Sequence, residues 1–178
     1  MNLKPFRDID EHEVINLFST VEADVSKGTF LQIVSFDPDL HNGPGASLPG
    51  TPAGTYSPSW EVYAKVKKAV SNTGVIGIAL VDVVPIGSNV NVVTVQDQYR
   101  YFDKVPSGKA IPILKRGMVE INGFSGVPQP GLKGYINTGG SAQAGQLVVG
   151  AADRADNVGT FLSTSGADGY AVFQLNCI

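Results

Sequence analysis

The sequence predicts an all-β protein, a barrel or sandwich of short strands that follows an N-terminal arm. Glycine (21) and proline (11) are both frequent among the 178 residues, which suits many turns and argues against a helical bundle. Runs of β-branched and aromatic residues recur roughly every 8–12 residues with turn residues between them, a spacing typical of barrels and sandwiches.

The arm is assigned to residues 1–27 and the body to residues 28–178. Asp10 and Glu13 have the spacing of a capping box, so a turn or two of helix is expected there. The apolar residues that follow predict that a neighbouring molecule orders the arm, whereas a frayed terminus is the alternative.

The body is expected to begin with a strand over residues 29–35, rich in β-branched and aromatic side chains. A Pro/Gly-rich loop over residues 37–59 follows. A loop of that length is generally functional, and its prolines favour an extended path that could reach another subunit.

Residues 60–70 alternate between apolar and polar side chains and are interpreted as a strand, although their composition would also suit a helix. Residues 75–81 are apolar on both faces, which predicts a strand buried on both sides. Residues 165–169 supply a hairpin turn before an alternating, half-buried strand that ends at Cys177. The other predicted strands are residues 90–95, 98–103, 110–114, 117–121, 134–137, 146–149 and 159–163.

Charge is scarce rather than unbalanced. Charged residues make up 16% of the chain, against about 25% in typical domains. The net charge of −3 disfavours a nucleic-acid partner, and no apolar run approaches the ~18 residues that span a membrane. Few charges with 43% hydrophobic residues suggest that much of the surface meets protein, and a monomer with a neutral surface fits equally well.

No catalytic, metal or cofactor site is predicted. His12 lies in an acidic cluster and His41 follows two aspartates, so either could bind a divalent cation. The segment before His41 is not an EF-hand, because Gly43 lies one place late and Leu48 occupies the twelfth position. Without a second convergent histidine or cysteine, solvated charge is the favoured interpretation. Serine nucleophiles also lack a plausible nearby base, so the chain is not expected to be an enzyme.

Several segments have the order of strand-forming and turn-forming residues that is typical of one protein family. They are residues 4–18, 28–30, 75–80, 111–120 and 158–172. Through them the chain resembles the decoration, or cement, proteins on the capsids of tailed bacteriophages. The resemblance implies a small antiparallel β-barrel or β-tulip body with an extended N-terminal arm. It also implies a homotrimer on the outer capsid surface. The loop over residues 37–59 has no clear counterpart in the family.

The resemblance implies a non-catalytic virion protein that is made in the host cytoplasm and needs no cofactor. Such a protein binds the outer capsid surface and stabilises the lattice by bridging neighbouring major capsid subunits. Its expected partners are the major capsid protein and its own copies, with neither nucleic acid nor membrane. The residues expected to contact the shell are Pro5, Phe6, Arg7, Val14, Ile15, Leu17 and Phe18. Those expected in an inter-subunit loop are Pro44, Leu48, Pro49, Pro52, Tyr56 and Trp60.

Two alternatives stay open. A carbohydrate- or receptor-binding β-module of a phage fibre would use Tyr56, Trp60, Tyr99 and Tyr101, because aromatic rings can stack on sugars. For most of these rings, burial in the core is the simpler interpretation. An enzyme with a metal at one of the histidines is the weakest of the three hypotheses.

Overall fold

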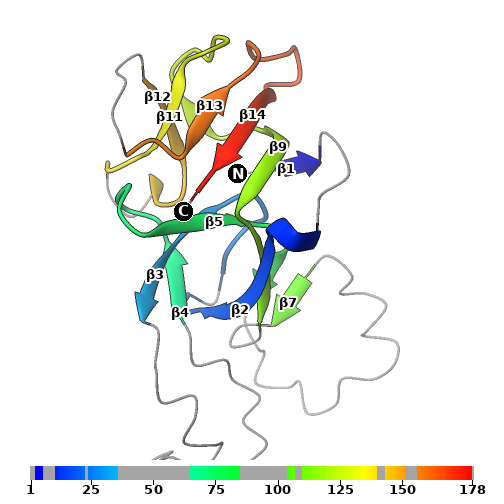
Figure 1. Ribbon diagram of the computed structural model, residues 1–178, viewed down its shortest axis with the longest axis vertical. Helices are drawn as coiled ribbons and strands as arrows, with labels where there is room; N and C mark the ends of the chain where they lie inside the picture. The colour runs from blue at the N-terminus through cyan, green and yellow to red at the C-terminus, as the bar shows by residue number, and fades with distance from the viewer. Residues whose placement is uncertain are drawn as a thin grey trace, which may run out of the picture.

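The computed structural model describes residues 3–5, 11–22, 24–35, 65–84, 104–106, 110–139, 143–150 and 156–177. Within these residues the chain is almost entirely β, which confirms the predicted fold class. Its strands form a closed five-stranded barrel, a seven-stranded sheet and a separate pair of short strands. Figure 1 shows the sheet stacked on one end of the barrel, with β5 running between them.

The barrel contains strands from the first two thirds of the chain. In order around the barrel they are β2 (Val14–Thr20), β4 (Lys65–Lys68), β3 (Phe30–Ser35), β5 (Val75–Ala79) and β8 (Ile111–Leu114). The pair β2–β4 is parallel and the other pairs are antiparallel. All five residues of β5 are buried, as predicted for a strand covered on both faces.

The second sheet is built mainly from the C-terminal third. Its strand order is β1 (Leu3–Pro5), β9 (Arg116–Ile121), β14 (Ala171–Asn176), β13 (Gly159–Phe161), β11 (Lys133–Ile136), β12 (Leu147–Gly150) and β10 (Phe124–Ser125). The pair β10–β12 is parallel and the others are antiparallel. The short strands β6 (Asp82–Val84) and β7 (Lys104–Pro106) pair in parallel beside the barrel.

Two hydrophobic cores follow from this arrangement. One fills the barrel and includes Leu31, Val66, Ile76 and Ile111. The other lies between the barrel and the sheet, where Phe30 of β3 belongs to the same cluster as residues of β9, β13 and β14. Strand β5 contributes to both, with Ile76 and Ala79 facing the barrel interior and Val75 and Ile78 facing the sheet.

The extended N-terminal arm is not confirmed. Leu3–Pro5 pairs with β9, and Val14–Thr20 forms a barrel strand. The expected helix is limited to one 3-10 turn, η1 (Glu11–Glu13). The apolar, β-branched residues after Glu13 pair instead with β8, where Val14 lies opposite Leu114. No helix in the described part of the chain is long and apolar enough to cross a membrane.

A polar contact fastens β1 to the C-terminal hairpin. Lys4 Nζ lies 3.1 Å from Asp168 Oδ2 and 3.8 Å from the ring centroid of Tyr170. The hydrogen bond from Lys4 lowers the pKa of Asp168, and the same bond raises the pKa of Lys4. Because both side chains are exposed to solvent, salt should weaken this contact.

Most of the predicted strands in the described residues are present within a residue or two of the expected bounds. The C-terminal strand β14 shows the predicted alternation, with Ala171, Phe173 and Leu175 buried between more exposed neighbours. The turn over residues 165–169 is also present. The predicted strands at 90–95 and 98–103, and the loop at 37–59, lie outside the described residues.

The core accounts for a testable property of the lone cysteine. Cys177 is 3% exposed, and burial raises the pKa of its thiol to about 12. Because the thiolate is the reactive species, we expect no reaction with a disulfide reagent at pH 8 while the protein is folded. Stoichiometric reaction is expected in guanidinium chloride. Rapid labelling of the native protein would contradict this burial.

Candidate functional site

The residues predicted to contact a capsid do not share one surface. Phe18 is only 6% exposed and packs inside the barrel, whereas Leu17 is 63% exposed. Val14 and Ile15 are half-buried, Val14 against the core below the sheet and Ile15 against the barrel core. Pro5 lies in β1. Outside the described residues are Phe6, Arg7, Pro44, Leu48, Pro49, Pro52, Tyr56 and Trp60, together with Tyr99, Tyr101 and His41.

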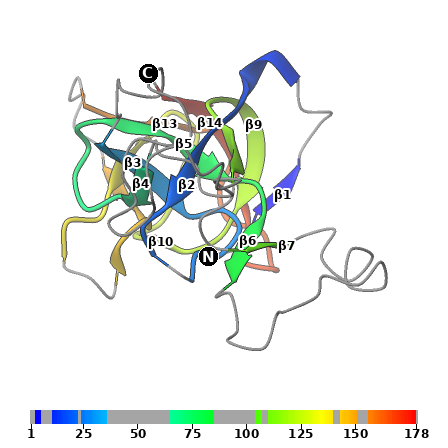
Figure 2. The same cartoon turned by 90° about the horizontal axis from the view of Figure 1, so that it is seen from below.

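The structure gathers a different set of apolar residues, which we call the barrel face: Leu17, Val21, Ile33, Val34 and Val70. Their exposed fractions range from 41% to 63%. They lie on, or directly beyond, strands β2, β3 and β4, which are neighbours in the barrel and lie close together in Figure 2. Sequence analysis identified only Leu17 of this set.

Backbone pairing connects the members of the barrel face. The amide of Val21 donates to the carbonyl oxygen of Val66 (2.9 Å), and Ile33 lies opposite the same Val66. The amide of Val70 donates to Oε1 of Gln32 at 2.7 Å. These contacts place Val21, Ile33 and Val70 along the β2–β4–β3 ladder.

Irregular register explains why apolar side chains point outward here. The pairing of β2 with β8 shifts between Ile15 and Phe18, and that of β3 with β4 shifts between Ile33 and Ser35. A bulge of this kind interrupts strict alternation and redirects the neighbouring side chains. Leu17 and Val34 lie inside these two irregular stretches, so both become solvent-exposed.

Lysines accompany the apolar residues of the barrel face. Lys65, Lys67 and Lys68 of β4 are half-buried between β2 and β3. The carboxylate of Glu22 accepts a hydrogen bond from the backbone amide of Lys68 at 3.2 Å. An apolar surface bordered by flexible cations suits contact with another protein, because the lysine stems add apolar area while their charges stay hydrated.

The described residues do not gather three or more His, Cys, Asp or Glu side chains as a metal site would. His12 is exposed in η1. Its neighbour Glu13 forms an ion pair with Lys115, with 3.6 Å between Oε2 and Nζ. The acidic cluster around His12 is therefore engaged in part by a lysine of the barrel.

The signal that could have revealed the barrel face was the pair Ile33-Val34. Two successive apolar residues at the end of a strand cannot both face inward, so one was bound to be exposed or covered by another element. The contributions of Val21 and Val70 depend on which strands are neighbours, and a single sequence does not show this. No protein-family model and no curated protein matches the chain.

Proposed function

We propose that the protein is a structural component of a tailed-phage virion, which binds the outer capsid surface and bridges neighbouring major capsid subunits. The observation that supports this best is the barrel face. Exposed apolar side chains concentrated on adjacent strands and bordered by polar groups are typical of surfaces that bind protein. The family resemblance of the sequence supplies the nature of the partner.

The scarcity of charge supports the same proposal. Charged residues are 16% of the chain, so few ionic groups would lose water when the surface is covered. A protein that binds only the assembled shell stabilises it by mass action. Three copies joined in a homotrimer raise the effective concentration of every further contact, so individually weak contacts are enough.

The structure changes which residues carry the proposal. Phe18 leaves the contact set because its side chain fills the barrel. Leu17 stays, and Val21, Ile33, Val34 and Val70 join it. Removal of residues 1–18 would not be a clean test, because it would delete β1 and most of β2.

The paired substitution Leu17→Asp with Val34→Asp tests the proposal. Two carboxylates would have to be buried without partners on contact with the shell, and each costs several kcal/mol. We expect at least a ~100-fold loss of affinity, measured by co-sedimentation of the purified protein with undecorated capsids of the phage that encodes it. Both side chains are exposed, so the thermal unfolding midpoint should change little.

A matched control uses apolar residues with comparable exposure on the sheet. Val127 and Leu162 are 73% and 40% exposed and follow β10 and β13 of the sheet. Val127→Asp with Leu162→Asp should bind capsids as the unmodified protein does. Wild-type binding by the barrel-face variant would refute the proposal. Equal loss in both pairs would show that added negative charge, rather than the barrel face, is responsible.

A further inference from the structure

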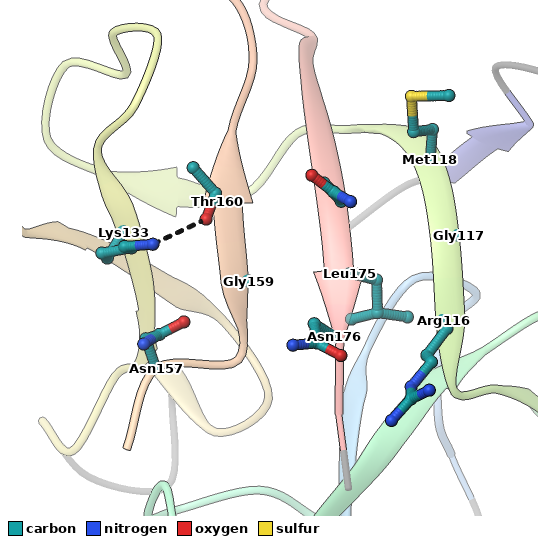
Figure 3. Close-up of a pocket in the computed structure, with 10 residues that line it drawn as sticks. Arg116, Gly117, Met118, Lys133, Asn157, Gly159, Thr160, Leu175 and Asn176 are labelled. Carbon is teal, nitrogen blue, oxygen red and sulfur yellow. Dashed lines mark hydrogen bonds between the residues drawn. The ribbon is translucent and has the colours of Figure 1, made fainter. Parts of the chain in front are cut away.

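A groove of about 620 Å³ crosses the outer face of the seven-stranded sheet (Figure 3). Most of its side chains come from the outward positions of four neighbouring strands. Cross-strand register places Met118, Gln174, Thr160 and Lys133 in one row across β9, β14, β13 and β11. Asn176 and Arg116 form the next row. The groove is therefore a consequence of strand order, with one residue from each strand in the longer row.

Two glycines lie between these rows, at positions where a side chain would point toward the core. Gly117 and Gly159 line the groove without side chains. A Cβ on Gly159 would collide with the main chain of Gln174 and the ring of Phe173, so no larger residue fits there without movement of β14. Main-chain atoms are consequently part of the groove wall.

The groove is positively charged within an acidic chain. Among the described residues that line it, Arg116 and Lys133 are charged and none is a carboxylate, whereas the whole chain carries a net charge of −3. Lys133 Nζ donates to Thr160 Oγ1 at 3.1 Å, a contact that holds the ammonium in place without neutralising it (Figure 3). Within the described residues Arg116 forms no ion pair.

Two acidic side chains in neighbouring parts of the described chain have other contacts. Asp156 accepts a hydrogen bond from Asn72 Nδ2 at 3.3 Å. The pKa of Lys4 is raised mainly by its hydrogen bond to Asp168, and Glu120, the next outward residue of β9, adds a smaller contribution. The two cations of the groove therefore keep their capacity to bind an anionic ligand.

The spacing of the two cations defines the ligand. Three strand-to-strand steps of about 4.8 Å separate β9 from β11, which is about 14 Å in total. The backbones that carry the two cations are therefore well separated, and an elongated ligand with two anionic groups can contact both without drawing the two side chains together. An extended peptide rises about 3.4 Å per residue, so carboxylates four residues apart are also about 14 Å apart. The carboxamides of Gln174 and Asn176 lie between the cations and can pair with peptide N–H and C=O groups.

We propose that this groove binds an extended acidic segment of a partner protein, with one carboxylate on Arg116 and another on Lys133. Sugars are a poorer match because none of the described residues that line the groove has an aromatic ring for stacking. Nucleic acid is a poorer match because two cations fall short of the roughly 6–10 phosphate contacts of typical binders. The groove lies on the sheet, so the inference goes beyond the capsid contact proposed for the barrel face.

Peptide spacing provides the test. The probe is a fluorescent Ser/Gly peptide with two glutamates four residues apart, titrated at low salt and followed by anisotropy. We expect binding about ten-fold tighter than that of a peptide with adjacent glutamates, and no measurable binding when glutamine replaces both. Arg116→Gln with Lys133→Gln should weaken binding of the first peptide by about ten-fold or more.

Lys27→Gln with Lys104→Gln removes the same charge near β6 and β7 and should leave binding unchanged. Equal loss in this control, or equal affinity for both glutamate spacings, would overturn the proposal. Tighter binding of an oligoglucuronate or an oligonucleotide than of the peptide would overturn it as well. If Lys133→Gln disturbs folding, Arg116→Gln alone removes an exposed side chain and should still weaken binding.

Discussion

Replacement of Phe173 by alanine is expected to lower the free energy of unfolding by about 3–5 kcal/mol. Phe173 is fully buried on β14. Its ring lies edge-on to that of Phe161 at 4.8 Å between centroids and to that of Phe30 at 6.3 Å. Phe161 belongs to the sheet and Phe30 to the barrel, so one side chain joins the two parts. Urea denaturation followed by far-ultraviolet circular dichroism would measure the loss.

The site cannot collapse easily once the ring is removed. The ring of Phe173 lies over Gly134 and Gly159, where even a Cβ would come within about 2.6 Å of its atoms. Glycine has no side chain that could move into the space, so a cavity should remain and add to the lost transfer energy. Phe173→Leu keeps part of the volume and should cost less. A loss below about 1 kcal/mol for alanine would show that the barrel and the sheet do not depend on this contact.

The local pattern of apolar and polar residues predicted those strands in which each face has the same environment from one end to the other. In β14, alternation identifies both the strand and its inward face, because a one-residue shift would expose Phe173 and Leu175. In β5, an uninterrupted apolar run identifies a strand covered on both sides. The structure provides the reason, since Ile76 faces one core and Ile78 the other.

Strands that depend on distant partners were harder to predict. The apolar residues from Val14 onward suggested an arm, because their partners lie far along the chain, in β4 and β8. Pairing between segments so far apart leaves no local signal beyond apolar character. Strands β6, β7 and β10 also leave no local signal, because they have only two or three residues each.

The two candidate surfaces were missed for a related reason. The barrel face needs bulges that turn Leu17 and Val34 outward, and bulges are not visible in a periodicity. The groove needs the register that aligns Met118, Gln174 and Lys133 across separate strands. Both surfaces therefore depend on which strands are neighbours in the barrel or the sheet, and not on a motif of consecutive residues.

Gly77→Ala is expected to destabilise the protein by at least about 3 kcal/mol, because the substitution obstructs closure of the barrel. Gly77 lies on β5 with φ 154°. A Cβ there would lie closer to the carbonyl oxygen of Leu114 than real contacts allow, and 2.8 Å from Cγ2 of Ile113. The obstacle is the main chain of β8, which pairs with β5, so the two strands would have to separate.

Gly74→Ala is the matched control, three residues earlier in the chain. Its φ is 72°, and nothing lies within 4 Å of the added Cβ, so only the conformational cost of about 1–2 kcal/mol applies. Thermal and urea unfolding of both variants would separate this cost from the collision. Equal losses at the two positions would mean that β5 and β8 are not held as closely as described. Because β5 supplies both cores, we expect Gly77→Ala to weaken the barrel and the sheet in a single transition.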